Sequence, residues 1–271
     1  MPIDLEVPVF GADAAFKAVE SRVTRVELNA TGSYPDGGLT PSVSDLERVA
    51  NLNVKVRIMI RPRGPLLESE PRDFIYSDEE FAQMERDIVK FKETGLLNEA
   101  RGDGFVFGIL KEGPESNNPT DVRSKSCWVD KERCSRLVAA ARPFKAVFHR
   151  AYDEIVSCDD NRPGIDERHA WRTGLDDLAQ CGFDSILTSG GLGKAIQNLA
   201  MLDKIITRAE SLGIEIIVGG GVRRNNALEI CQRLKLNENK YSTCVHSACL
   251  SNPESEYVDA EEVTGILSQL G

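Results

Sequence analysis

The chain has 271 residues, of which 41% are hydrophobic and 28% are charged, and its formal net charge is −10. These values are typical of a soluble globular protein, and no run of residues is apolar enough to span a membrane. The acidic balance argues against a surface that binds nucleic acid, although it does not exclude a local basic pocket. The sequence therefore predicts neither a membrane nor a nucleic-acid partner.

The N-terminal segment has no basic region followed by a long apolar stretch, so we expect no signal peptide. The sequence contains seven cysteines, an odd number, and none of them form a CxxC pair. Reduced thiols in a cytoplasmic protein are therefore expected rather than a disulfide framework.

Short β-branched runs alternate with longer amphipathic stretches along the whole chain. We expect strands at Leu5–Val9, Arg22–Leu28, Val54–Ile60, Gly104–Leu110, Ala146–His149, Ser185–Thr188, Glu215–Val218 and Thr243–His246. We expect helices at Ala12–Ser21, Val43–Asn51, Asp78–Thr94, Lys131–Ala141, Glu167–Cys181, Lys194–Leu212, Arg224–Leu234 and Ala260–Leu270. This alternation predicts an α/β protein, a single (β/α)8 TIM-barrel domain over residues 1–271, in preference to an open doubly wound sheet. Long loops are expected near residues 64–74, 111–129 and 154–166.

Polar side chains gather at the carboxyl ends of the predicted strands, where barrels of this kind place their active sites. These strand ends carry Glu27, Arg61, Arg63, His149, Arg150, Asp153, Ser189, Gly220, His246 and Ser247. Two of the three histidines in the chain are among them, and histidine is the side chain best suited to proton transfer near neutral pH. The candidate catalytic residues are Glu27, His149, Asp153 and His246.

Three arginines at the same ends predict a basic pocket within an acidic protein, which suits a small carboxylate or phosphate. Glycine turns at Gly190–Gly191 and Gly219–Gly221 expose backbone N–H groups just before predicted helices, and such groups bind anions. The candidate anion-binding residues are Arg61, Arg63, Arg150, Ser189, Gly220 and Ser247.

Structural roles are the alternative for several of these residues. Glu27 and Arg61 can pair with each other in the barrel mouth, and Arg150 and Asp153 can form an ion pair that fixes a loop. The glycines Gly219–Gly221 can form only a tight turn. Ser42 is expected to cap a helix, and His169 is expected to have a structural role within a predicted helix.

Several segments, taken in order, closely resemble the CutC family, which is named for copper homeostasis. They are RVELNATGSYPDGGLTPS, IRPRG with DFIYSDEEF, GFVFGIL, FHRAYD, ILTSGG, VGGGV and VHSA. The resemblance runs from about Leu5 to Ala248, and it implies a TIM barrel, a cytoplasmic homo-oligomer (a dimer or tetramer) and copper ion binding. It also implies that the polar residues shared by the family are the strand-end residues named above, with the exception of Gly220.

Two cysteines of the family's motifs are absent from this chain. Many members read EVCV and IELC where this sequence has Glu6–Val9 and Val26–Asn29, so Pro8 and Asn29 replace the thiols. Because Cu(I) prefers thiolate and thioether ligands, a copper site built from that cysteine pair cannot form here.

Three functions remain open on these grounds. The first is copper binding, with Glu27, His149 and His246 as ligands, although the strands that carry the two histidines are well separated around a barrel. The second is an enzyme whose arginines hold a small anionic substrate while Glu27 or His149 transfers a proton, with lyase, isomerase and hydrolase chemistry all open. The third is a non-catalytic scaffold. The expected partner is a small anionic ligand or a metal ion, and no organic cofactor is indicated.

Overall fold

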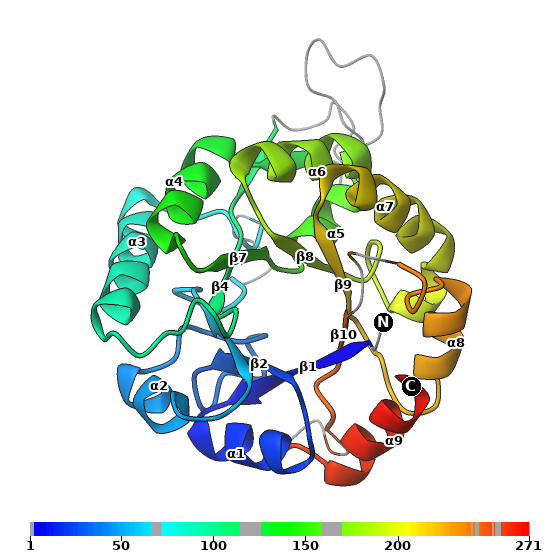
Figure 1. Ribbon diagram of the computed structural model, residues 1–271. Helices are drawn as coiled ribbons and strands as arrows, with labels where there is room; N and C mark the ends of the chain where they lie inside the picture. The colour runs from blue at the N-terminus through cyan, green and yellow to red at the C-terminus, as the bar shows by residue number, and fades with distance from the viewer. Residues whose placement is uncertain are drawn as a thin grey trace.

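Eight parallel strands close into a barrel in this computed structural model, which describes residues 3–66, 72–113, 126–158, 170–239, 241, 244–250, 252 and 256–270. In order around the barrel they are β1 (Asp4–Phe10), β2 (Arg25–Asn29), β3 (Lys55–Met59), β4 (Gly104–Phe107), β7 (Lys145–Phe148), β8 (Ser185–Thr188), β9 (Glu215–Val218) and β10 (Cys244–His246). The last of these strands pairs with the first, so the sheet has no free edge (Figure 1).

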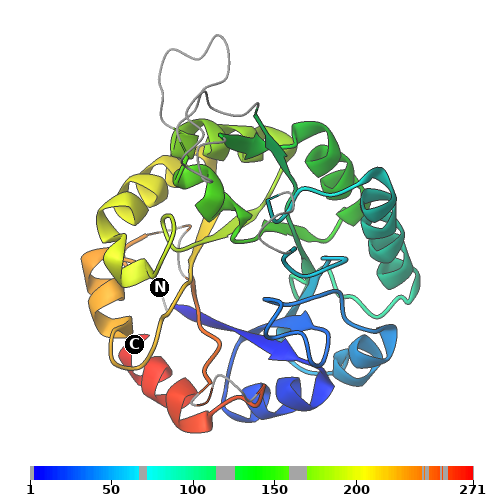
Figure 2. The same cartoon turned by 180° about the vertical axis from the view of Figure 1, so that it is seen from behind.

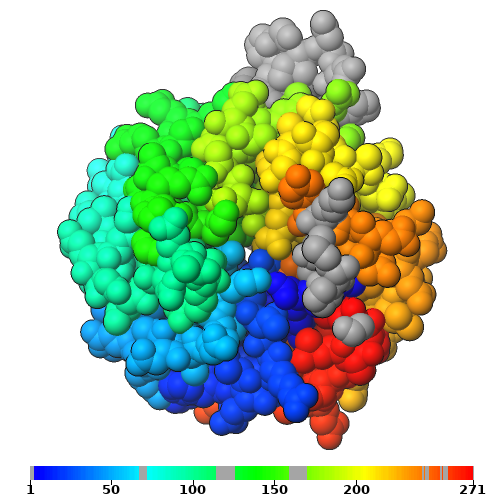
Figure 3. Space-filling view, in the orientation of Figure 1, coloured from blue at the N-terminus to red at the C-terminus, as the bar shows by residue number. Residues whose placement is uncertain are grey.

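Helices form a ring around the strands, as both views of the ribbon show (Figures 1 and 2). They are α1 (Ala12–Glu20), α2 (Val43–Val49), α3 (Asp78–Glu93), α4 (Lys131–Ala141), α6 (Ala170–Cys181), α7 (Leu199–Leu212), α8 (Ala227–Arg233) and α9 (Ala260–Leu270). The first elements and the last helix, blue and red in Figure 3, lie side by side on the surface. None of the helices in the described ranges is long and apolar enough to cross a membrane.

Local sequence signals explain where several helices begin and end. Ser42 caps α2 as predicted, because its Oγ accepts a hydrogen bond from the backbone N–H of Asp45. Ser77 and Glu80 form a capping box at the start of α3. Helix α7 ends at Gly213, whose left-handed φ of 69° other residues adopt only at a cost. The predicted role of His169 lies outside the described residues.

The predicted TIM barrel is confirmed, but the prediction of two loops is wrong in part. The ends of the predicted loop 111–129 pair as an antiparallel hairpin of β5 (Leu110–Glu112) and β6 (Cys127–Val129). The predicted loop 154–166 begins inside a short helix, α5 (Ala151–Val156). These elements have three to six residues, too few to show a hydrophobic period.

The barrel interior holds both an apolar cluster and a group of charged side chains. The apolar cluster consists of Met59, Val106, Val147, Leu187, Ile217 and Cys244, which pack together. Among the charged side chains, Arg25 of β2 lies 3.1 Å from Glu215 of β9, although these strands are not neighbours. The same arginine contacts Glu6 of β1. Arg25 and Glu215 are the first residues of their strands, so their ion pair crosses the interior near the amino ends of the strands.

Candidate functional site

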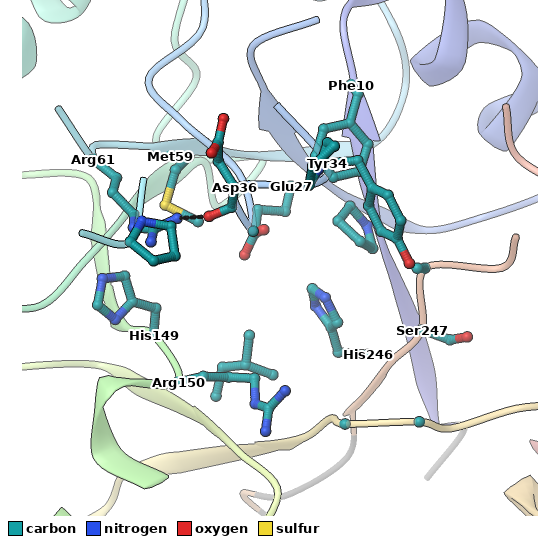
Figure 4. A pocket seen from close by; sticks show the side chains of 18 of the residues that line it. Phe10, Glu27, Tyr34, Asp36, Met59, Arg61, His149, Arg150, His246 and Ser247 are labelled. Carbon is teal, nitrogen blue, oxygen red and sulfur yellow. Dashed lines mark hydrogen bonds between the residues drawn. The ribbon is translucent and has the colours of Figure 1, made fainter. Parts of the chain in front are cut away.

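A cavity of about 460 Å³ opens at the carboxyl ends of the strands. Figure 4 shows the Glu27 carboxylate and the rings of His149 and His246 around one open space. The predicted site residues that line the cavity are Glu27, Arg61, His149, Arg150, Gly220, His246 and Ser247. The predicted site residues that do not line it are Arg63, Asp153 and Ser189. The strand-end rule therefore brings most of the predicted residues to one place.

His246 lies beside a buried carboxylate on the neighbouring strand. The register pairs Glu6 of β1 with His246 of β10, and Nδ1 of the histidine lies 2.8 Å from Oε1 of the glutamate. Burial alone raises the pKa of Glu6, but Arg25 and His246 outweigh burial and hold this pKa at about 2. Burial alone lowers the pKa of His246, but the Glu6 hydrogen bond and the charge of Glu27 outweigh it and raise this pKa above its ordinary value. The ring is therefore protonated on Nδ1 and donates to Glu6.

Glu27 faces the same histidine from β2. Burial raises the pKa of Glu27, and the Glu6 carboxylate raises it further, while His246 and Asn29 partly oppose this change. Oε1 accepts a hydrogen bond of 3.3 Å from the Asn29 amide, and Oε2 has no hydrogen-bond partner among the described residues. A carboxyl with a raised pKa beside a basic imidazole is suited to general acid–base catalysis.

His149 has the opposite protonation behaviour. Its Nδ1 accepts a hydrogen bond of 3.2 Å from the backbone N–H of Ala151, the first residue of α5. Burial, and then the charge of Arg61, lower the pKa of His149 to about 3. The neutral ring therefore carries its hydrogen on Nε2, which is buried and has no partner in the described part of the chain. A neutral imidazole of this kind can donate to a developing oxyanion.

A His149→Gln variant is expected to lose less stability in acid than the parent protein. Between about pH 6.5 and pH 3 the unfolded chain binds a proton at His149 and the folded chain does not, so this residue's contribution is lost as the pH falls. The full shift corresponds to roughly 4–5 kcal/mol, of which about 3 kcal/mol falls between pH 7 and pH 4. Urea unfolding at pH 7, 5.5 and 4 measures the difference, and equal pH slopes in the two proteins would rule out a neutral His149.

Arg150 is held in place by residues behind the cavity wall. Its Nε lies 2.8 Å from Oδ2 of Asp153, which is the ion pair considered from the sequence. Asp153 is buried and also accepts hydrogen bonds from the hydroxyl of Thr188 and from the backbone N–H and hydroxyl of Ser189. Asp153 and Ser189 were predicted to be site residues, but neither lines the cavity. Their contacts orient Arg150 instead.

The predicted clamp of two arginines is wrong. Arg61 reaches the cavity wall, but its guanidinium is engaged by Asp73 at 2.8 Å and by two backbone carbonyls of the loop after β2. No ion pair joins Arg61 to Glu27, both of which are described. Arg63 turns away from the cavity and donates to Glu80 at the start of α3, at 2.6 Å. Both arginines thus brace loops around the mouth, because nearby carboxylates and carbonyls take most of their donors.

Two residues at or beside the cavity were absent from the sequence prediction. Glu6 is an acidic residue within the apolar run of β1. Because successive strand residues face opposite sides, its position in the run was the sequence signal that could have placed it in the barrel interior. Arg223 lines the cavity two residues beyond the glycine turn after β9, and its Nη1 lies 3.3 Å from the hydroxyl of Ser247. Arg150, Arg223 and the turn at Gly220–Gly221, with φ values of 93° and 73°, form the basic side of the cavity.

A family model described as the CutC family matches residues 3–245. The chain belongs to the CutC family. The copper homeostasis protein cutC homolog of Homo sapiens is 31% identical over 229 residues, which cover 84% of this chain and 68% of that protein. A CutC family protein of Histophilus somni is 30% identical over 237 residues, covering 87% and 80%. The crystal structure of the putative copper homeostasis protein CutC from Streptococcus agalactiae matches with a TM-score of 0.67 and 25% identity, covering 91% of this chain and 98% of that one.

Pro8 and Asn29, the two residues expected from the sequence to replace cysteines of the family's motifs, lie at the cavity. Pro8 lines the cavity and pairs in register with Glu27, while Asn29 is buried and hydrogen-bonds to Glu27. No described cysteine lines the cavity, and among the described residues its sulfur comes from Met59. A single thioether among carboxylates and imidazoles does not fit Cu(I), which prefers several thiolate or thioether ligands.

Proposed function

We propose that this CutC protein is an enzyme that transfers a proton to or from a small anionic substrate held in the cavity. The observation that carries the proposal is the pairing of two histidines with opposite protonation in one cavity. His246 is basic and lies beside Glu27, whereas His149 is neutral and presents Nε2–H. Groups whose environments push their pKa values apart are the mark of an acid–base site.

The reaction class that suits this arrangement is proton abstraction from a carbon next to a carbonyl group. Glu27 is the base, because Oε2 is unbonded among the described residues and the raised pKa makes the carboxylate a better proton acceptor. His149 donates from Nε2 to the oxygen on which negative charge develops. Arg150 and Arg223 bind the substrate's carboxylate or phosphate at the rim, together with the backbone N–H groups of the turn at Gly220–Gly221.

Solvent exchange tests this function whatever product the reaction forms. The protein is incubated in D₂O with a panel of small 2-oxo acids and phosphorylated hydroxy-ketones, and loss of substrate C–H signals is followed by proton NMR. We expect exchange with at least one class of compound, abolished by inorganic phosphate at high concentration because it competes for the basic side. The proposal would be contradicted if no compound of the panel exchanged and none changed the proton NMR signals of His149 and His246.

A second candidate function is the binding of a divalent cation, Cu(II) included. One observation favours it: ligand atoms of Glu6, Glu27 and His246 lie within 4.8 Å of one another, a group that does not include His149. Carboxylate and imidazole donors suit divalent ions better than Cu(I). The names of the relatives, which refer to copper homeostasis, agree with such a role.

Equilibrium dialysis with Cu(II) tests this candidate. We expect the parent and a His149→Ala variant to retain one equivalent per chain that a His246→Ala variant does not retain, because only His246 belongs to the group. Equal retention by all three proteins would place the metal elsewhere and remove this candidate.

A further inference from the structure

Two cysteines outside the cavity lie side by side. Cys127 is on β6 of the hairpin and Cys158 follows α5, and their Sγ atoms are 3.6 Å apart. Nη1 of Arg72 lies 3.3 Å from each sulfur, so one cation faces both thiols. Cys127 is 3% exposed, whereas Cys158 is half-buried and reachable from solvent.

The surroundings of this pair separate the two thiols chemically. Hydrogen bonding from Cys127, and then the charge of Arg72, lower the pKa of Cys158, although burial opposes this. The same hydrogen bond, with burial, raises the pKa of Cys127. Arg72 is held in place by Glu112 at 3.2 Å and Glu154 at 3.1 Å. One sulfur is thus favoured as a thiolate and the other as a thiol that donates to it.

The remaining cysteines differ from this pair. Cys134, Cys181, Cys231, Cys244 and Cys249 are buried, and burial raises the pKa of each. Thiolate character and access to solvent decide which cysteines react, so Cys158 is the reactive thiol among the cysteines.

We propose that Cys127 and Cys158 form a redox-active dithiol that reduces small disulfides, with Cys158 as the attacking thiolate and Cys127 as the resolving thiol. A disulfide has an S–S distance of about 2.05 Å, so the sulfurs have to approach by about 1.5 Å from 3.6 Å. The bond would link the hairpin to the end of α5. The proposal is independent of the function assigned to the cavity.

The exchange proceeds in two balanced steps. The Cys158 thiolate attacks one sulfur of a disulfide R–S–S–R, which forms a mixed disulfide and releases RS⁻. The Cys127 thiol then gives its proton to solvent or to the released thiolate and attacks Sγ of Cys158, which releases the second RS⁻. Two electrons pass from the two cysteines to the small disulfide, which becomes two thiols.

Oxidised glutathione is the probe for this activity. The reduced full-length protein is treated with it at pH 7, quenched by alkylation and mapped by mass spectrometry. We expect the unmodified chain to form a Cys127–Cys158 disulfide without a lasting adduct. A disulfide between other cysteines would overturn the proposal. A faster loss of free, alkylatable thiol at Cys231 than at Cys158 would also overturn it. This measurement needs no variant.

Variants separate the two roles. Cys127→Ser is expected to accumulate a glutathione adduct on Cys158, whereas Cys158→Ser should react at least about tenfold more slowly. Arg72→Gln should move the pH profile of the first step to higher pH, because the thiolate loses its cation. The matched control, Cys231→Ser, should oxidise as the parent does. An unchanged pH profile in Arg72→Gln, or no adduct in Cys127→Ser, would contradict the assigned roles.

Discussion

An Arg25→Met variant is expected to lose about 3–5 kcal/mol of its free energy of unfolding at pH 7. Arg25 is 2% exposed inside the barrel, with Nε 2.7 Å from a Glu6 oxygen and Nη1 3.1 Å from a Glu215 oxygen. Methionine fills a similar volume but removes the charge. Glu6, 1% exposed, then remains a buried anion that only His246 and the charge of Arg57 help to balance among the described residues.

Urea unfolding followed by circular dichroism measures this loss, with Arg48→Met as the matched control. Arg48 pairs with Asp13 at the surface, where side chains are 51% and 74% exposed, so its removal should change stability by at most about 1 kcal/mol. The double variant Arg25→Met/Glu6→Gln should regain part of the loss, because it removes the unbalanced carboxylate as well. A loss at Arg25 no larger than at Arg48 would show that the interior ion pairs contribute little.

The barrel could be predicted because its strands are buried on both faces. Such strands appear in a sequence as short apolar runs, and β8 (Ser185–Thr188) and β9 (Glu215–Val218) have the predicted bounds. The hairpin β5–β6 could not be predicted, since its strands are joined by tertiary pairing rather than by a pattern. The predicted strand Gly104–Leu110 extends beyond β4 into the first residue of β5, because the apolar residues continue past Gly108.

The site was predicted only as far as the strand-end rule reaches. That rule places His149 and His246 at the cavity, because each lies at the carboxyl end of a buried strand, His149 directly after β7 and His246 as the last residue of β10. It cannot tell which way a long side chain turns in a loop. Arg63, which was predicted to bind the anion, turns away from the cavity, and Arg223, for which no role was predicted, lines it. Glu6 was missed because one acid within a strand usually faces solvent, whereas in a closed barrel it can face the interior.

A Glu27→Gln variant is expected to slow solvent exchange of the substrate about 10²–10⁴-fold, with little change in KM. Glutamine has the same shape and can keep the hydrogen bond with Asn29, but its amide cannot accept a proton. Because the Glu27 charge helps to raise the pKa of His246, that pKa should fall in the variant and remain supported by Glu6. Proton NMR of the imidazole signals measures this change without any substrate.

Glu47→Gln is the matched control, since Glu47 is exposed on α2 and far from any strand end in the sequence. It should leave both the exchange rate and the His246 titration unchanged. His149→Gln separates the two chemical roles, because it removes the oxyanion donor and leaves the base. The exchange rate of this variant should fall, and the limb of the pH profile that reports Glu27 should remain. If Glu27→Gln exchanged at the parent rate and left the His246 pKa unmoved, Glu27 would be a buried structural carboxylate, and the base would have to be sought elsewhere in the cavity.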